Sequence, residues 1–201
     1  MRCAMRAVSK LNSAIVLCFF GSIAFSHGAL AVDRRDNGNV ISMDSSCNVT
    51  RFYGVPIELT VSMLKRLPLP ARIAREMGEG ETFITAKIKA ERGVEIKVEF
   101  DANKKLELLK TTSPNAVDLR GIRPGSSLSD VEAAWPNGKL YYGAADGRYV
   151  RYITGTNVIY TFDPDDMDPQ AFDPSGKEVV VPNLKVVAIE IRSAPVPVAG
   201  R

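Results

Sequence analysis

Five aspartates lie within eleven residues of the second half of the chain, in the run Asp163-Pro164-Asp165-Asp166-Met167-Asp168-Pro169-Gln170-Ala171-Phe172-Asp173-Pro174. Carboxylate oxygens are the ligands that calcium prefers, so the candidate calcium ligands are Asp163, Asp165, Asp166 and Asp168. However, the glycine that a calcium-binding loop needs at its sixth position is absent, and three prolines interrupt the ligand spacing. A hydrolase that uses two of these carboxylates is a second alternative, but such catalysis needs two acids about 5 to 10 Å apart on rigid elements. We therefore interpret residues 163–174 as a solvated, proline-stiffened loop and expect no metal and no cofactor.

A group of tyrosines and arginines between residues 141 and 162 is the second chemical signal. Alternation along a strand at 148–153 places Tyr149 and Arg151 on one face and Arg148 and Tyr152 on the other. One of these faces must point away from a packed helix, and tyrosine and arginine are residue types that often anchor protein interfaces. We predict a protein-binding face formed by Tyr141, Tyr149, Arg151 and Tyr160. The alternative is that the tyrosines rim the core with their hydroxyl groups in water.

Two serines, Ser126 and Ser127, stand where a turn enters a predicted helix. The one histidine of the chain, His27, lies far from these serines in the sequence. A serine nucleophile here would therefore need a lysine or a carboxylate as the base that removes its proton. A serine at such a place also caps the first turn of the helix, and we favour this simpler role. Arg123, beside the same helix start, could help hold an anion at the free backbone N–H groups.

The first 31 residues have the pattern of a secretory signal peptide. Three basic residues and no acidic one precede an apolar run at 14–25, which is shorter than the roughly 20 residues of a membrane-spanning helix. Ala29-Leu30-Ala31 supplies the small residues of a cleavage site. We therefore predict a processed chain that begins near Val32 and is periplasmic or secreted, with a retained membrane anchor as the alternative.

Removal of this segment changes the chemistry that is available. Cys3, Cys18 and His27 leave with it, so the processed chain has no histidine and a single cysteine, Cys47, which is either a free thiol or a bridge between two chains. Structural zinc sites and histidine-based triads are excluded. Three of the 26 basic residues also leave, and the remaining 23 balance the 23 acidic residues. Because nucleic-acid binding depends on neutralising phosphates, we expect no nucleic-acid partner.

Both halves of the remaining chain predict the same order of elements. Residues 54–68 and 121–136 each read as a short strand, a capping hydroxyl residue (Thr60 in the first half), an amphipathic helix and a terminating proline. Apolar alternation then predicts strands at 84–90, 94–100, 106–110, 148–153, 157–162 and 184–191. Short turns favour antiparallel pairing. We predict an α+β fold, with short amphipathic helices packed on antiparallel sheet. The common order suggests two tandem helix-plus-sheet units, although such units also arise without duplication.

One stretch carries a family resemblance, Gly121-Ile122-Arg123-x-Gly125-Ser126-Ser127-x-x-Asp130-Val131 followed by antiparallel strands. It resembles the opening of small bacterial envelope modules of the BamE (SmpA/OmlA) and β-lactamase-inhibitor-protein kinds. The chain departs from BamE in lacking a lipidated cysteine, and from the inhibitor family in lacking the cysteines for its disulfides. The resemblance implies helices packed on sheet in a tandem pair of units.

These features divide the chain into a signal peptide (1–31), a flexible lead-in (32–52), a first helix-plus-sheet unit (53–113), a second unit that contains the acidic loop (114–193) and a proline-rich tail (194–201). We expect an exported, noncatalytic module that binds a protein or envelope component through an exposed sheet face. A carboxylate- or metal-dependent hydrolase that uses the acidic loop is one alternative, and a purely structural envelope protein is another. After signal removal, no segment is long and apolar enough to span a membrane.

Overall fold

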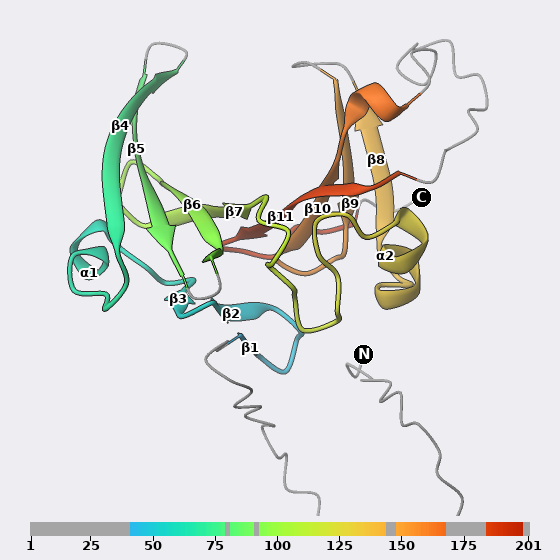
Figure 1. Cartoon of the computed structure of the whole chain (residues 1–201), viewed down its shortest axis with the longest axis horizontal. Coiled ribbons are helices and arrows are strands. Elements are labelled where there is room, and N and C mark those ends of the chain that lie inside the picture. The colour runs from blue at the N-terminus through green and yellow to red at the C-terminus, as the bar shows by residue number, and fades with distance from the viewer. Residues whose placement is uncertain (1–40, 79–80, 91–92, 144–147, 168–183, 199–201) are drawn as a thin grey trace, which may run out of the picture.

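A computed structural model of the chain describes residues 41–78, 81–90, 93–143, 148–167 and 184–198 (Figure 1). The predicted signal peptide, most of the lead-in, Asp168 and the rest of the acidic loop lie outside these ranges. Cys47 forms a disulfide in the structure of the whole chain. The prediction of a single cysteine applies instead to the chain without residues 1–31. Among the described residues, no helix has the length and apolar composition of a membrane span.

An eight-stranded antiparallel sheet forms the body of the molecule, in the order β4-β5-β6-β7-β11-β10-β9-β8 (Figure 1). The first half of the chain supplies β4 (Ala71–Gly78), β5 (Glu81–Lys89), β6 (Glu95–Phe100) and β7 (Leu106–Thr111). The second half supplies β8 (Lys139–Gly143), β9 (Tyr149–Ile153), β10 (Val158–Phe162) and β11 (Val186–Arg192). The last strands of the two halves meet at the centre, where Leu109 of β7 pairs with Ile191 of β11. Both halves therefore share one continuous sheet.

The remaining elements are short. Three strands, β1 (Ser42–Met43), β2 (Val49–Phe52) and β3 (Val55–Pro56), form a small antiparallel sheet. The helices are α1 (Val61–Leu64), α2 (Leu128–Ala134) and the 3-10 turn η2 (Pro164–Asp166). Thr60 and Ser127 cap the two α-helices as predicted, since each side chain accepts a hydrogen bond from the backbone N–H three residues later.

The predicted α+β fold is wrong, because the described residues form a mostly β structure with α-helices of only four and seven residues. The amphipathic patterns are real but cover one or two turns each before a proline follows. Cross-strand pairs, not helix packing, organise the chain. No internal repeat is shown, and the division into units at 53–113 and 114–193 stays a prediction.

The large sheet is strongly curved, so that β4 and β5 rise as one arm and β8 and β9 as the other (Figure 1). Helices α1 and α2 and the small sheet lie on its convex side. The main core fills this side, with fully buried residues such as Phe52, Leu109, Tyr160 and Ile191. Side chains that alternate with the core residues point to the concave side, which we call the concave face.

Candidate protein-binding face

Tyr149 and Arg151 lie on the concave face, as the alternation along this strand predicts. Their neighbours Val150 and Tyr152 are buried in the core, whereas Tyr149 is 37% exposed and Arg151 half-buried. Arg151 stands directly opposite Tyr141 of β8, so the structure brings together three of the four predicted binding residues. The Arg151 guanidinium lies 5.7 Å from the centre of the Tyr149 ring.

Tyr160, the fourth predicted binding residue, does not belong to this face. It pairs with Tyr152 across β9 and β10 and is 0% exposed, on the core side of the sheet. Its hydroxyl accepts a 2.7 Å hydrogen bond from Trp135 Nε1 and donates to Asp118. Tyr160 is therefore a core residue and cannot contact a partner on the concave face.

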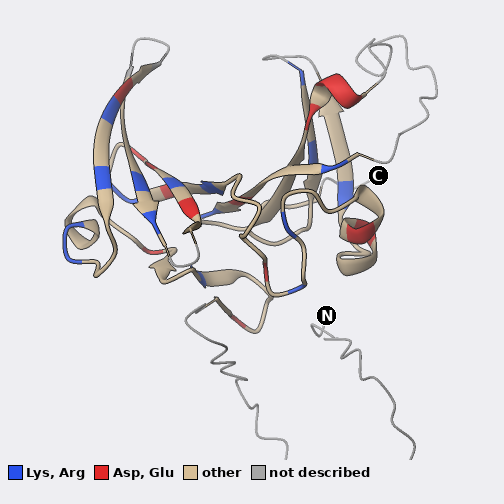
Figure 2. Ribbon diagram, in the orientation of Figure 1, with Lys and Arg blue, Asp and Glu red and all other residues tan. Residues whose placement is uncertain are grey.

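A row of basic residues crosses the concave face from one edge of the sheet to the other. The strand registers place one residue of each strand in line, in the order Lys139, Ile153, Ile159, Glu190, Lys110, Lys97, Lys87 and Arg72. We call its five basic members (Arg72, Lys87, Lys97, Lys110 and Lys139) the cationic row. Figure 2 shows lysine and arginine on both arms and on the strands between them.

Three lysines of the cationic row are direct cross-strand neighbours, since Lys97 pairs with Lys87 on one side and with Lys110 on the other. Like charges directly opposite each other destabilise a sheet. Nearby glutamates compensate for this repulsion: Lys110 Nζ lies 3.0 Å from Glu190 Oε1, and Lys97 Nζ lies 3.0 Å from Glu76 Oε2.

Two weaker contacts complete this compensation, with Lys97 3.4 Å from Glu99 and Lys87 3.6 Å from Glu95. Hydrogen bonds from Lys97 and from Thr85 hold the pKa of Glu76 below its ordinary value. Each of these four glutamates thus lies within 4 Å of a lysine of the row, and Lys97 is shared by two of them.

Other basic groups on this face have no carboxylate partner within the described part of the chain. Arg72, Lys89 and Arg151 form no ion pair with an acidic side chain there, and the Arg151 guanidinium lies near the Tyr149 ring. Lys139 Nζ lies 5.7 Å from the centre of the Tyr141 ring. Positive charge is therefore in excess on the concave face, although basic and acidic residues are equal in number after residue 31.

Three polar atoms at the bottom of the concave face are buried and make no hydrogen bond with the described residues: Arg151 Nε, Thr161 Oγ1 and Glu190 Oε2. They come from the adjacent strands β9, β10 and β11, and Arg151 is the direct neighbour of Thr161. Buried polar groups in native proteins are nearly always paired, so these three atoms are exceptions among the described residues.

The acidic loop begins with residues that are engaged with the protein itself. Asp163 accepts a hydrogen bond from the backbone N–H of Asp165 at 2.9 Å, which starts the η2 turn. Asp165 forms a 2.5 Å ion pair with Arg148, and Asp166 is exposed. No group of three potential metal ligands occurs in the described ranges, and Asp168 lies outside them.

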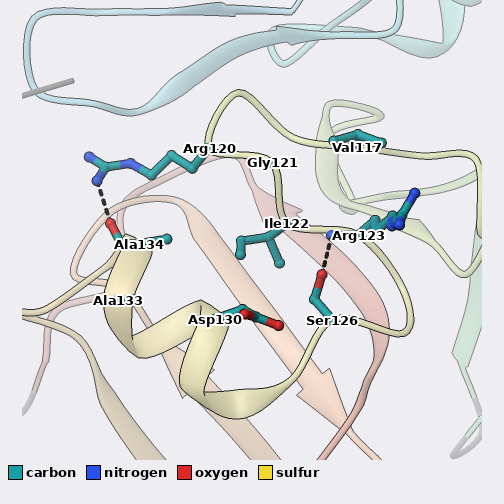
Figure 3. A pocket seen from close by; sticks show the side chains of 9 residues that line it. All are labelled: Val117, Arg120, Gly121, Ile122, Arg123, Ser126, Asp130, Ala133 and Ala134. Carbon is teal, nitrogen blue, oxygen red and sulfur yellow. Dashed lines mark hydrogen bonds between the residues drawn. The ribbon is translucent and has the colours of Figure 1, made fainter. Parts of the chain in front are cut away.

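Ser126, before the start of α2, borders an open pocket of about 590 Å³, shown in Figure 3. Ser126 accepts a 3.1 Å hydrogen bond from the backbone N–H of Arg123, and Ser127 forms a capping box with Asp130. The hydrogen bond from the Ser127 hydroxyl lowers the pKa of Asp130 below its ordinary value. Both serines thus have structural roles at the helix start.

Sequence reasoning missed the cationic row. Alternation alone indicated that Lys87 and Lys97 lie on the outer face of their strands, but it could not show that they stand side by side. That depends on the register of each strand pair, which alternation within a single strand does not reveal.

No known protein family matches the sequence, and no curated protein matches it either. A solved structure with some likeness is the uncharacterized protein yfeY from Escherichia coli, at 17% identity and a TM-score of 0.48. The likeness covers 69% of this chain and 93% of that one.

Proposed function

We propose that this protein is an exported, noncatalytic module that binds a protein of the cell envelope through its concave face, and that the bound surface carries carboxylates. The observation that carries the proposal is the excess of positive charge on this face: the cationic row crosses it, and its members Arg72 and Lys139 contact no acidic side chain among the described residues. Carboxylates of a partner would add further compensating charge. The same charges would also speed the encounter with an acidic surface.

The aromatic residues on the β8 and β9 arm supply the second part of the argument. Tyr149 and Tyr141 present rings beside Arg151, and such residues give a large contact area with a polar group at the end. The curvature of the sheet places this arm across from β4 and β5 (Figure 1), the strands that carry Arg72 and Lys89. A partner surface that lies against the concave face would contact residues of both arms.

Export is part of the proposal and rests on the signal-peptide pattern of residues 1–31. Mass spectrometry of the protein recovered from the cell exterior or periplasm tests it. We expect an N-terminus at Val32, within a residue or two, and no lipid. Recovery of an intact Met1 or of an acylated cysteine would contradict export by this route.

The binding proposal is tested by capture from a nuclease-treated envelope fraction, with quantitative mass spectrometry of the retained proteins. Replacing Tyr149 and Arg151 together by alanine should change the thermal melt little, because Tyr149 is exposed and the buried Nε of the half-buried Arg151 makes no hydrogen bond with the described residues that would be lost. Loss of interface anchors typically costs about 2 kcal/mol or more, so partner binding should weaken roughly 30-fold.

The chain offers a matched control on the other face of the same two strands. Tyr142 is 38% exposed, and Arg148 is an exposed neighbour of β9, so the Tyr142→Ala and Arg148→Ala pair removes similar side chains. A partner specific to the concave face is lost with the first pair and kept with the second.

Charge reversal tests the acidic partner. Lys139→Glu should weaken capture, and added salt should do the same, because charges near the surface are screened. Lys65→Glu, in the loop after α1, serves as the control. If neither added salt nor Lys139→Glu weakens capture, the partner surface is not acidic. If no protein depends on Tyr149 and Arg151, the concave face is not the binding site.

A further inference from the structure

The outermost strand of one arm, β4, is an open edge of unusual length. It spans eight residues, and the side chains from Ala71 to Met77 are all exposed, with Ile73 at 41% and Met77 at 83%. Its pairing with β5 shows no bulge from Ala71 to Gly78, and the strand contains no proline and no lysine. Bulges, prolines and lysines are devices by which proteins prevent an edge from pairing with another chain, and β4 has none of these three, although it carries the charged residues Arg72, Arg75 and Glu76.

The direction of the backbone groups of β4 follows from one hydrogen bond. Lys89 N donates to the Pro70 carbonyl at 2.9 Å, and the register pairs Ala71 with Ile88. Since antiparallel partners exchange hydrogen bonds at every second residue, the even-numbered residues of β4 bond to β5. The odd-numbered residues 71, 73, 75 and 77 therefore direct their backbone N–H and C=O groups away from the sheet.

We propose that this edge pairs antiparallel with β4 of a second copy of the chain, with the two-fold axis at Ala74. In this register the outward residues Ile73 and Arg75 face each other and exchange backbone hydrogen bonds. Arg72 then stands opposite Glu76 of the second copy, and by symmetry the same ion pair forms twice. The two Ala74 residues meet at a non-hydrogen-bonded position, where Cα atoms approach to about 4.5 Å and a small side chain fits well.

Other registers that keep the outward residues paired are less favourable. A shift by one residue toward the hairpin tip places Arg75 opposite Arg75. A shift in the other direction leaves Arg72 opposite Ala74, without a charge partner. Of these three registers, only the one centred on Ala74 places opposite charges against each other. This charge complementarity of the strand with itself favours a second copy over an unrelated strand.

The existing contacts of Glu76 are compatible with this pairing. Its carboxylate accepts hydrogen bonds from Thr85 and from Lys97, each at 3.0 Å. Two carboxylate oxygens offer about four acceptor positions, so a guanidinium can be added without removing either bond. The dimer would extend each sheet across the axis, engage Arg72 of each cationic row at the interface, and leave the remaining residues of both concave faces open to other partners.

The alternation of inward and outward backbone groups along β4 can be tested by sedimentation velocity. The exported protein is measured at roughly 100 µM, a concentration at which a contact with a dissociation constant of about 1 µM is almost fully formed. We expect a dimer for the unmodified chain. Ile73→Pro removes an outward N–H and no hydrogen bond to β5, so it should yield a monomer whose melting temperature falls much less than that of Ala74→Pro. Ala74→Pro removes an inward N–H and should instead lower the melting temperature.

Cysteine placement tests the register itself. Two-fold symmetry brings position 74 against itself, so Ala74→Cys should crosslink into a dimer under mild oxidation. Arg72→Cys, on the same face two residues away, should not crosslink, nor should the unmodified chain with Cys47. Efficient crosslinking through position 72 would show another register and overturn the proposed one.

The outcomes separate this proposal from the concave-face function. A monomeric unmodified chain at roughly 100 µM, or a dimer that survives Ile73→Pro, would overturn self-pairing. Loss of a captured envelope protein with Ile73→Pro from a monomeric chain would show that β4 pairs with another protein instead. Both proposals hold if the Tyr149→Ala and Arg151→Ala pair affects only capture and if Ile73→Pro affects only the oligomeric state.

Discussion

Trp135 Nε1 donates a 2.7 Å hydrogen bond to the hydroxyl of Tyr160, and that hydroxyl donates in turn to the carboxylate of Asp118. Asp118 also accepts 2.8 Å hydrogen bonds from the backbone N–H groups of Arg120 and Ile122. All three side chains of this chain of contacts are buried. The network thus ties the loop before α2, the end of α2 and strand β10 into one unit on the convex side of the sheet.

Tyr160→Phe should destabilise the protein without affecting binding on the concave face. The substitution leaves Trp135 Nε1 and one oxygen of Asp118 buried without their partner, and an unsatisfied buried polar group costs roughly 1 to 3 kcal/mol. Urea unfolding measures the loss. Tyr149→Phe, which removes a hydroxyl from an exposed ring, is the control and should change stability little. A stable Tyr160→Phe variant would show that the network adds nothing to the fold.

Alkaline pH should weaken the fold through two buried phenols. Burial, and secondarily the charge of Glu132, raises the pKa of Tyr152 to about 12, and burial raises the pKa of Tyr160 well above its ordinary value. In the unfolded chain both lose their protons near pH 10. Because the folded state keeps protons that the unfolded state loses, this contribution to stability is complete below about pH 10 and is lost as pH rises toward the folded values.

Unfolding free energies measured at pH 9, 10 and 11 check this sign. Each phenol should contribute a decline of up to about 1.4 kcal/mol per pH unit above pH 10. Tyr152→Phe should show a shallower decline than the unmodified chain. Equal slopes for the two proteins would mean that Tyr152 ionises as readily in the folded state as in the unfolded one.

Strands with one buried face could be predicted from the sequence, and strands without one could not. Apolar alternation predicted β5, β6, β7, β9, β10 and β11, and each of these strands appears near its expected position. The edge strand β4 was missed, because its side chains are exposed on both faces and its residues Ala, Arg, Glu and Met favour helices in isolation. Only its pairing with β5 makes it a strand.

Calcium should not stabilise the protein. Asp163 and Asp165 are already used by the η2 turn and by Arg148, so binding would have to break these contacts. A thermal melt with and without millimolar calcium tests this, since ligand at 100 times its dissociation constant adds roughly 2.7 kcal/mol of stability. We expect no resolvable shift. A rise of several degrees that disappears with Asp163→Asn and Asp165→Asn would establish a calcium site.

The candidate binding face was predictable within one strand but not between strands. Alternation placed Tyr149 and Arg151 correctly because both lie on β9. Tyr160 was misplaced because the turn at 154–157 fixes its register, pairing it with Tyr152 of the core face. Predicting the cationic row requires the register of every neighbouring pair of strands. A register shift of one residue in any of these pairs would point a lysine toward the core.

Two glycines of the β8 arm should respond differently to the same substitution. A Cβ at Gly138 would lie 2.2 Å from Tyr152 Cε1 and 2.9 Å from the backbone oxygen of Ile153. The Tyr152 ring is held by its 2.6 Å hydrogen bond to the Trp135 carbonyl, so neither neighbour can easily move. Overpacking of this kind costs roughly 1 to 3 kcal/mol, and Gly138→Ala should lower the unfolding free energy by that amount.

Gly143→Ala is the matched comparison, because its Cβ would meet the ring end of Tyr149, 2.8 Å from the hydroxyl oxygen. This side chain is 37% exposed and can swing away, so stability should change by less than about 0.5 kcal/mol. The movement would re-aim Tyr149 on the concave face, and capture of the envelope partner should weaken. Equal destabilisation by both substitutions would show that Tyr149 is held as firmly as Tyr152. A Gly143→Ala variant with full capture would show that the orientation of Tyr149 does not matter for binding.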